Sequence, residues 1–312
     1  MGRSARRDPA EPPCRFVEFD ATDGVRLYGL LFEPRRQSKR VVIFLHGTGG
    51  ASIFDSRRTN PLAEEFTSNG IAFFPFNNRG AGVMKRLHKR GTKKKSVLGG
   101  MTYERIADCV PDIDGAIRDL RARGYRDFTL MGHSTGANKI AVYDHYKRIN
   151  RVDRYVFLAG GDDVGLMYKQ LGGLRFRWTL RRARARRNEQ ELVPSSLSEA
   201  PMSWRSFYDL INPDGDYNIF PFLEVMRRKK MSKRTPFRYL RAVRKPSLVI
   251  YGEKDEYFID KARRYMSVLA DVVGQNPYFE LVLVKDADHG FTGREDDLGN
   301  LIGSWLRRDD RR

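Results

Sequence analysis

The sequence of 312 residues predicts an α/β fold, a doubly wound and mostly parallel sheet that carries an inserted cap. Short apolar runs rich in β-branched and aromatic residues alternate with helical patterns, which is typical of βαβ units. The turn Thr22-Asp23-Gly24 separates two alternating strands, 15–20 and 25–33, and predicts an antiparallel hairpin at one edge of the sheet. The alternation breaks once, because about 85 residues without a clear buried strand lie between Ala159 and Pro246.

The strands and helices of this sheet can be placed in order along the chain. After the hairpin, the expected strands are the apolar runs 41–45, 71–76, 127–131, 155–159, 247–251 and 279–284. The expected helices are 61–69, 102–123 with Pro111 as a kink or break, 135–148, 258–273 and 295–308. The resulting units are a flexible tail (1–13), a core (14–160 and 241–312), and a basic cap (161–240) whose aromatic side chains mostly pack it onto the sheet.

Composition excludes several classes of protein. An apolar fraction of 40% with 12% aromatic residues supports a core and excludes wholesale disorder. Two cysteines, Cys14 and Cys109, cannot build a disulfide framework or a cysteine-rich zinc site, and we expect both as reduced thiols. A mean hydropathy of −0.57 and the lack of a long apolar run exclude a transmembrane span. No apolar segment follows the polar N-terminus, so a cytoplasmic protein is expected.

Residues 132–136, Gly-His-Ser-Thr-Gly, form a G-x-S-x-G motif in the structural context that this motif requires. An apolar strand precedes it and a helical pattern follows it. Glycine at 132 and 136 leaves room where a Cβ atom would collide with neighbouring backbone. The motif therefore predicts a sharp turn with the hydroxyl of Ser134 exposed at the end of the strand, as a nucleophile requires.

A serine nucleophile needs a base and an acid that orients the base. Of the five histidines, His289 is the best candidate, because it follows the strand 279–284 in a loop that can reach the serine. The acid is expected between Ser134 and His289, also at a strand end, and Asp255 follows 247–251 through Gly252. Asp286 and Asp288 are the alternative acids, but they lie too close to His289 in sequence to face its Nδ1 easily.

A second glycine-rich turn, His46-Gly47-Thr48-Gly49-Gly50, ends the strand 41–45. On its own it could be a plain tight turn, but its small residues let backbone amides approach a substrate oxygen. We expect the backbone amides of Thr48 and Thr135 to form an oxyanion hole. His46 is expected to be a structural hydrogen-bonding group, and His133 to point into the sheet.

The serine motif, the candidate base, the candidate acid and the second glycine-rich turn agree in order and position with one known fold. Residues 15–308 resemble the α/β-hydrolase superfamily. Three further stretches, 76–80 (FNNRG), 132–138 (GHSTGAN) and 160–164 (GGDDV), resemble DUF1749-type hydrolases, a group that includes fungal siderophore esterases. The resemblance implies two-step acyl transfer on an ester or amide of a small molecule, without a metal or organic cofactor. Acyl transfer to another acceptor and peptide cleavage use the same triad, and the sequence does not separate them.

The formal charge of +19 is concentrated in two segments. Residues 85–95 hold 7 basic and no acidic side chains, and residues 161–245 hold 19 basic and 9 acidic ones. Because both follow strands of the predicted sheet, we expect them at the mouth of the pocket, where they would favour anionic substrates or an anionic membrane surface. The alternative is that both are solvated loops. A protein that binds nucleic acid or an anionic membrane on this scaffold, through the basic runs 181–187 and 227–230, is the competing class, but no recognition motif accompanies these runs.

Overall fold

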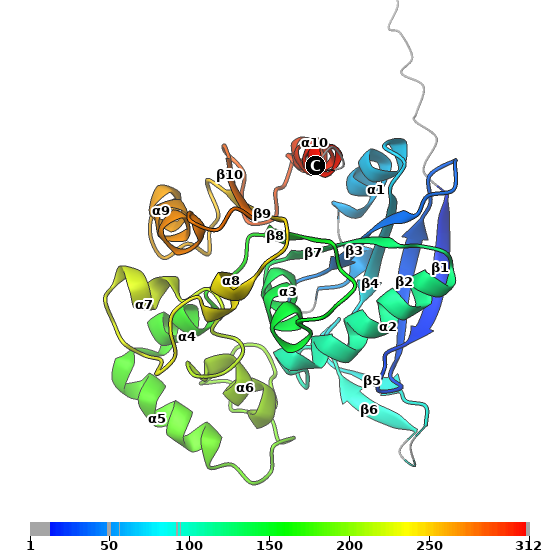
Figure 1. Ribbon diagram of the computed structural model, residues 1–312. Coiled ribbons are helices and arrows are strands. Elements are labelled where there is room, and N and C mark those ends of the chain that lie inside the picture. Colours follow the sequence, from blue (N-terminus) through cyan, green and yellow to red (C-terminus); the bar gives the residue numbers. More distant parts are fainter. Residues whose placement is uncertain (1–12, 49–50, 56, 92, 94, 310–312) are drawn as a thin grey trace, which may run out of the picture.

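One eight-stranded sheet forms the centre of the computed structural model, which describes residues 13–48, 51–55, 57–91, 93 and 95–309 (Figure 1). The strand order is β1-β2-β4-β3-β7-β8-β9-β10. The strands are β1 (Cys14–Asp20), β2 (Arg26–Phe32), β3 (Arg40–Leu45), β4 (Ala72–Asn77), β7 (Asp127–His133), β8 (Arg154–Leu158), β9 (Ser247–Gly252) and β10 (Phe279–Val284). The β1–β2 and β2–β4 pairs are antiparallel and the other five are parallel, which confirms the predicted fold class and its edge hairpin.

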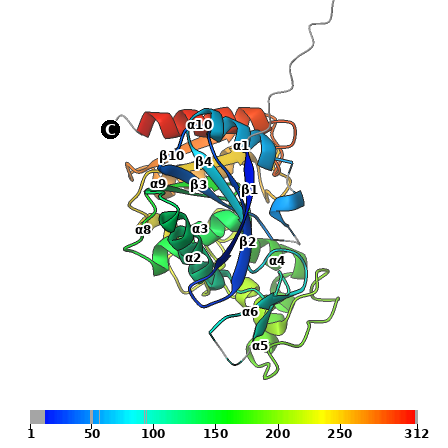
Figure 2. The same ribbon diagram turned by 90° about the vertical axis from the view of Figure 1, so that its right-hand side faces the viewer.

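Helices cover both faces of the sheet. Figure 2 shows α1 (Thr59–Ser68) and α10 (Glu295–Asp309) side by side on one face, with α2 (Cys109–Ala122) and α3 (Thr135–Tyr146) on the other. Helix α9 (Ala262–Val273) packs on β10. The helix expected from residue 102 begins only at Cys109, after the 3-10 turn η2 (Ile106–Asp108). Pro111 therefore lies in the first turn of α2, where its missing N–H costs no helical hydrogen bond.

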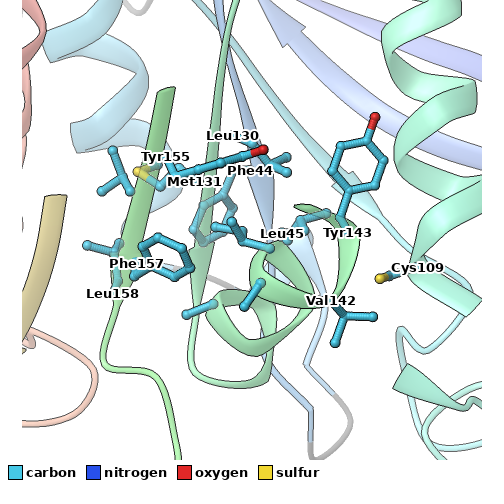
Figure 3. Close-up of a cluster of buried hydrophobic side chains, with 14 of the residues drawn as sticks. Phe44, Leu45, Cys109, Leu130, Met131, Val142, Tyr143, Tyr155, Phe157 and Leu158 are labelled. Carbon is cyan, nitrogen blue, oxygen red and sulfur yellow. The ribbon is translucent and has the colours of Figure 1, made fainter. Parts of the chain in front are cut away.

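Helix α3 is the most deeply buried helix next to the sheet, and every residue from 135 to 143 is buried. Figure 3 shows Val142 and Tyr143 of α3 near Phe44, Leu45 and Leu130 from strands β3 and β7. A helix enclosed on all sides is fixed by packing. The residue at its N-terminus is therefore held on a rigid support.

The segment between β8 and β9 contains five helices and no strand of the main sheet. They are α4 (Asp163–Leu171), α5 (Gly173–Arg184), α6 (Trp204–Ile211), α7 (Phe222–Met226) and α8 (Arg238–Ala242). Figure 1 shows α4 to α7 grouped together, away from α1 and α10. Most of the aromatic side chains in this segment are buried, as expected, but Trp178 is exposed.

The basic segment 85–95 is not the loop that we expected. Residues Lys85–His88 form β5, which pairs in antiparallel register with β6 (Ser96–Gly99). Leu87 is the buried residue of β5 and lies opposite Val97. The apolar signal of β5 is weak in the sequence, because Lys85 and Arg86 precede its single buried residue. None of the described helices is long and apolar enough to cross a membrane.

Candidate active site

Ser134 lies between the end of β7 and the start of α3, in a strained backbone conformation. Its φ is 57° and its ψ is −128°, a region that residues with a side chain rarely occupy. The two glycines of the motif make this turn feasible. A Cβ atom on Gly132 would collide with the carbonyl of Gly136, and one on Gly136 would collide with the carbonyl of Leu45. The sequence Gly-x-Ser-x-Gly therefore sets the tight contact between β7, α3 and β3.

Ser134 and His289 both line a cavity of about 370 Å³. The turn after β3 and the first residues of the segment that follows β8 also line this cavity. This is the edge of a parallel sheet, at the carboxyl ends of its strands, where α/β proteins place their binding sites.

Asp255 and His289 form a direct hydrogen bond. The Nδ1 atom of His289 lies 2.8 Å from Oδ2 of Asp255, and both side chains are largely buried. The other carboxylate oxygen of Asp255 accepts the backbone N–H of Tyr257 at 3.0 Å. With Oδ2 as its acceptor, the Nδ1 atom of His289 carries the proton and its Nε2 is left as the basic nitrogen.

Backbone contacts between the loops after β9 and β10 bring Asp255 and His289 together. The N–H of Lys254 donates to the carbonyl of Ala287 at 2.8 Å. Gly252 passes so close to the same loop that a Cβ atom there would collide with Ala287 and Asp288. The two other candidate acids have different partners. Asp286 pairs with Lys254 at 2.7 Å, and Oδ1 of Asp288 accepts the N–H of Thr292 at 2.8 Å.

The turn after β3 lies against the serine. A Cβ atom added to Gly47 would lie 3.0 Å from Cβ of Ser134, and Thr48 lines the cavity. Thr135 is the first residue of α3, where backbone amides have no partner within the helix. The Nδ1 atom of His46 donates to the carbonyl of Gly47 at 2.7 Å, and burial lowers the pKa of His46 to about 3. His46 is therefore neutral. Gly49 and Gly50 lie outside the described residues.

We expected His133 to point into the sheet, but it points towards the loop that carries His289. Its Nε2–H donates to the carbonyl of His289 at 2.7 Å. Its Nδ1 faces Nη2 of Arg58 at 3.2 Å, and Nη1 of Arg58 donates to the carbonyl of Gly290 at 2.9 Å. Burial and the charge of Arg58 hold the pKa of His133 well below its usual range. A neutral His133 can accept from Arg58 and donate to His289 at the same time.

Three residues of the cavity were not predicted from the sequence as site residues. Arg58 belongs to a polar stretch without a motif, and Tyr257 packs its half-exposed ring 4.6 Å from that of His289. Asp163 lines the cavity from the start of α4, and its Oδ2 accepts the side-chain N–H of Asn138 at 2.9 Å. Asn138 and Asp163 belong to two of the stretches that resemble DUF1749-type hydrolases, which is the signal that could have paired them.

The expected basic entrance is wrong for this cavity. Arg58 is the one arginine or lysine among the described residues that line it, and two of its N–H groups are already used. The hairpin β5–β6 lines a different cavity of about 680 Å³, which also holds four acidic side chains. They are Asp23, Glu104, Asp108 and Glu189. The predicted position of this hairpin was wrong because the order of the strands does not determine the direction in which a long hairpin extends from the sheet.

The sequence matches the model of the alpha/beta hydrolase family over residues 42–298. The chain belongs to the alpha/beta hydrolase family. No curated protein matches it. The narrower resemblance to DUF1749-type hydrolases stays a prediction.

Solved structures of alpha/beta hydrolases share the fold at low sequence identity. The Pyrococcus furiosus esterase PF2001 is 18% identical with a TM-score of 0.59, over 95% of this chain and 91% of the other. Est1E from Butyrivibrio proteoclasticus, in a structure with bound ferulic acid, is 14% identical with a TM-score of 0.61, over 95% and 100%. A serine hydrolase homologue from Coxiella burnetii is 16% identical with a TM-score of 0.54, over 94% and 97%.

Proposed function

We propose that this alpha/beta hydrolase cleaves carboxylic esters of small molecules through Ser134, His289 and Asp255, with an acyl-enzyme intermediate. One observation carries the proposal. His289, whose Nδ1 lies 2.8 Å from Oδ2 of Asp255, lines the same cavity as Ser134 on its strained turn. The order of the three residues along the chain is the one used by this family.

The reaction proceeds in two steps that share one base. In the first step, Nε2 of His289 takes the hydroxyl proton while Oγ of Ser134 attacks the carbonyl carbon of the ester. The carbon–oxygen bond to the alcohol breaks, and the imidazolium returns the proton to the departing alcohol. In the second step, His289 removes a proton from water, which attacks the acyl-enzyme and releases the acid. The buried Asp255 stabilises the imidazolium in both steps.

The backbone amides of Thr48 and Thr135 are the proposed donors to the oxyanion. Gly47 and Ser134 lie in contact, so the turn after β3 and the N-terminus of α3 flank the same point. The positive end of the α3 dipole adds to the two N–H groups. A donor of this kind contributes roughly 3–4 kcal/mol to stabilising the transition state.

The first residues of the inserted segment 161–240 form one wall of the cavity, and we propose this segment as the cap. Gly161, Asp163 and Leu166 contribute to that wall. Asp163 places a carboxyl group there, and no described residue donates a hydrogen bond to its Oδ1. Arg58 uses its guanidinium on the His289 loop. This lining favours a neutral or cationic substrate over the anionic one suggested by the total charge.

The Pyrococcus furiosus esterase PF2001, one of the structural neighbours, agrees with an ester substrate. Acyl transfer to an acceptor other than water and peptide cleavage remain the alternatives on the same triad. Adding an alcohol or amine acceptor to the assay distinguishes an acyltransferase from a hydrolase, because a transferase would form the acylated acceptor in preference to the free acid. A peptidase would cleave amides at rates comparable with those of matched esters.

Pre-steady-state hydrolysis of a p-nitrophenyl ester tests the proposal. We expect a burst of p-nitrophenol equal to the enzyme concentration, and its loss in Ser134→Ala. Ser52→Ala is the matched control, because Ser52 also lines the cavity but bonds to Asn77. If the Ser134→Ala variant hydrolyses the ester as fast as wild type, or Ser52→Ala abolishes the burst, the proposed nucleophile is wrong.

A further inference from the structure

Helix α5 exposes two large apolar side chains on one face. Leu174 is 84% exposed and Trp178 is 55% exposed, and they are one helical turn apart. The opposite face of α5 is buried through Phe176, Thr179 and Ala183. Because the helix is anchored by this inner face, the outer face is free to meet a partner.

Arginines flank the apolar pair on both sides of the helix. At 100° per residue, Arg177 and Arg184 lie on one side of the line through Leu174 and Trp178, and Arg182 lies on the other. These three arginines and Arg181 are exposed, and none forms an ion pair with an acidic side chain in the described part of the chain. Arg182 lies over the Trp178 ring, 5.3 Å from its centroid. The outer face of α5 is therefore apolar along its middle and strongly cationic along its sides.

We propose that α5 docks this protein onto an anionic phospholipid surface. Arginines attract acidic headgroups, and a tryptophan and a leucine between them can enter the boundary between headgroups and acyl chains. A nucleic acid would satisfy the arginines, but its phosphate backbone offers nothing to Leu174, the more exposed of the two apolar side chains on this face. No described residue of α5 lines the catalytic cavity, so docking does not depend on the proposed hydrolysis.

Tryptophan fluorescence with vesicles tests the docking directly on the full chain. The chain has three tryptophans, and Trp204 and Trp305 are only 1% and 6% exposed. A shift of the tryptophan emission on vesicle binding therefore reports on Trp178. We expect a blue shift with vesicles of phosphatidylcholine and phosphatidylglycerol, little change with phosphatidylcholine alone, and reversal at high salt. No shift with the anionic vesicles, together with no co-sedimentation, overturns the proposal.

Three double variants separate the parts of the surface. Arg181→Ala with Arg184→Ala should weaken vesicle partitioning by roughly 25-fold, about fivefold for each cation. Leu174→Ala with Trp178→Ala should weaken co-sedimentation by about tenfold. Lys93→Ala with Lys95→Ala removes the same charge from the exposed tip of the hairpin and should change it by less than about threefold.

The apolar pair distinguishes a membrane from the alternative partner. If the Leu174→Ala and Trp178→Ala double variant binds anionic vesicles as well as wild type does, the proposal fails. It also fails if the hairpin variant loses as much binding as the α5 arginine variant. Tighter binding of a single-stranded oligonucleotide than of anionic vesicles at the same salt, unaffected by Leu174→Ala, would assign the surface to nucleic acid instead.

Discussion

Cations inside the hydrolase core and cations on helix α5 are placed in opposite ways. In the core, Lys139 of α3 is fully buried and its Nζ lies 2.7 Å from Oε1 of the buried Glu104. Arg58 spans His133 and the carbonyl of Gly290. On α5, the exposed arginines named above have no acidic partner among the described residues.

The difference shows that a total charge of +19 combines two kinds of cation. A buried cation with a fixed partner holds the geometry of the site, and its removal leaves an unpaired group in a low-dielectric interior. An exposed cation without a partner contributes little to folding and is available for binding. Substitutions in the two regions should therefore have separable effects, in stability and activity for the core and in binding for α5.

The largest expected effect is at the buried pair of Lys139 and Glu104. Lys139→Met leaves Glu104 buried without its partner and should lower the free energy of unfolding by about 3–5 kcal/mol. Urea denaturation measures the change. The double variant Lys139→Met with Glu104→Leu should recover part of the loss. If the single variant costs less than about 1 kcal/mol, the core cation does not have the role given to it here.

The next effect is on catalysis, at Arg58. Arg58→Met removes the donors to His133 and to Gly290, so the His289 loop loses two of its supports. We expect kcat on a p-nitrophenyl ester to fall by roughly 10–100-fold with little change in KM. Arg58→Lys should recover part of the rate. Arg57→Met, at the exposed neighbouring residue, is the control, and an equal loss there would contradict the positioning role.

A smaller effect is expected at Asp163, and it depends on pH. Burial, with a further contribution from the charge of Asp162, raises the pKa of Asp163 to about 7. The carboxylate therefore forms as the pH rises through about 7, and wild type should then increasingly favour a cationic ester over its neutral isostere, by a few fold between about pH 6 and pH 8. The ratio of the two kcat/KM values measures this preference, and its pH dependence should be weaker in Asp163→Asn, where Asp162, whose pKa burial also raises to about 7, still titrates.

Several titratable or charged groups surround Asp163. They are Asp162 and Tyr217 beside it and, from the other walls of the cavity, His46, Arg58, His133 and His289. The same ionisation also affects stability. Because the pKa in the folded state lies above the ordinary value, the contribution of Asp163 to stability falls as the pH rises from about 4 to about 7. Asp163→Asn should remove that part of the pH dependence of unfolding.

The smallest effect on the folded protein is expected on α5. Arg181→Ala with Arg184→Ala should change the free energy of unfolding by less than about 0.5 kcal/mol, because both side chains are exposed. Its kcat/KM on a soluble ester should equal that of wild type. Thermal unfolding and steady-state kinetics check both statements. A loss of activity without vesicles would show that α5 and the cavity are not independent.

The main strands were predictable because parallel strands buried on both faces are continuous apolar runs. Each predicted run overlaps its observed strand closely, as 279–284 overlaps β10. The hairpin β5–β6 was missed because each of its strands has only four residues, and the first contains a single apolar residue, Leu87. The start of α2 was missed because Pro111 is compatible both with a break and with a first turn.

The candidate site was predictable only where a residue follows a strand. Ser134, Asp255 and His289 each do so, and parallel topology brings such ends to one edge. Arg58 and His133 could not be assigned in this way, because their bonds join positions as far apart as Arg58 and Gly290. The cavity wall at Asp163 depends on how the inserted segment returns to the sheet, which local sequence does not specify.

Labelling by a fluorophosphonate, followed by peptide mass spectrometry, tests the central claim most directly. We predict one adduct on Ser134 in the folded wild type, none in Ser134→Ala, an undiminished adduct in Ser52→Ala and much slower labelling in Asp255→Asn. Folded wild type that forms no adduct, or an adduct that persists in Ser134→Ala, would contradict the assignment of Ser134 as the nucleophile of this hydrolase.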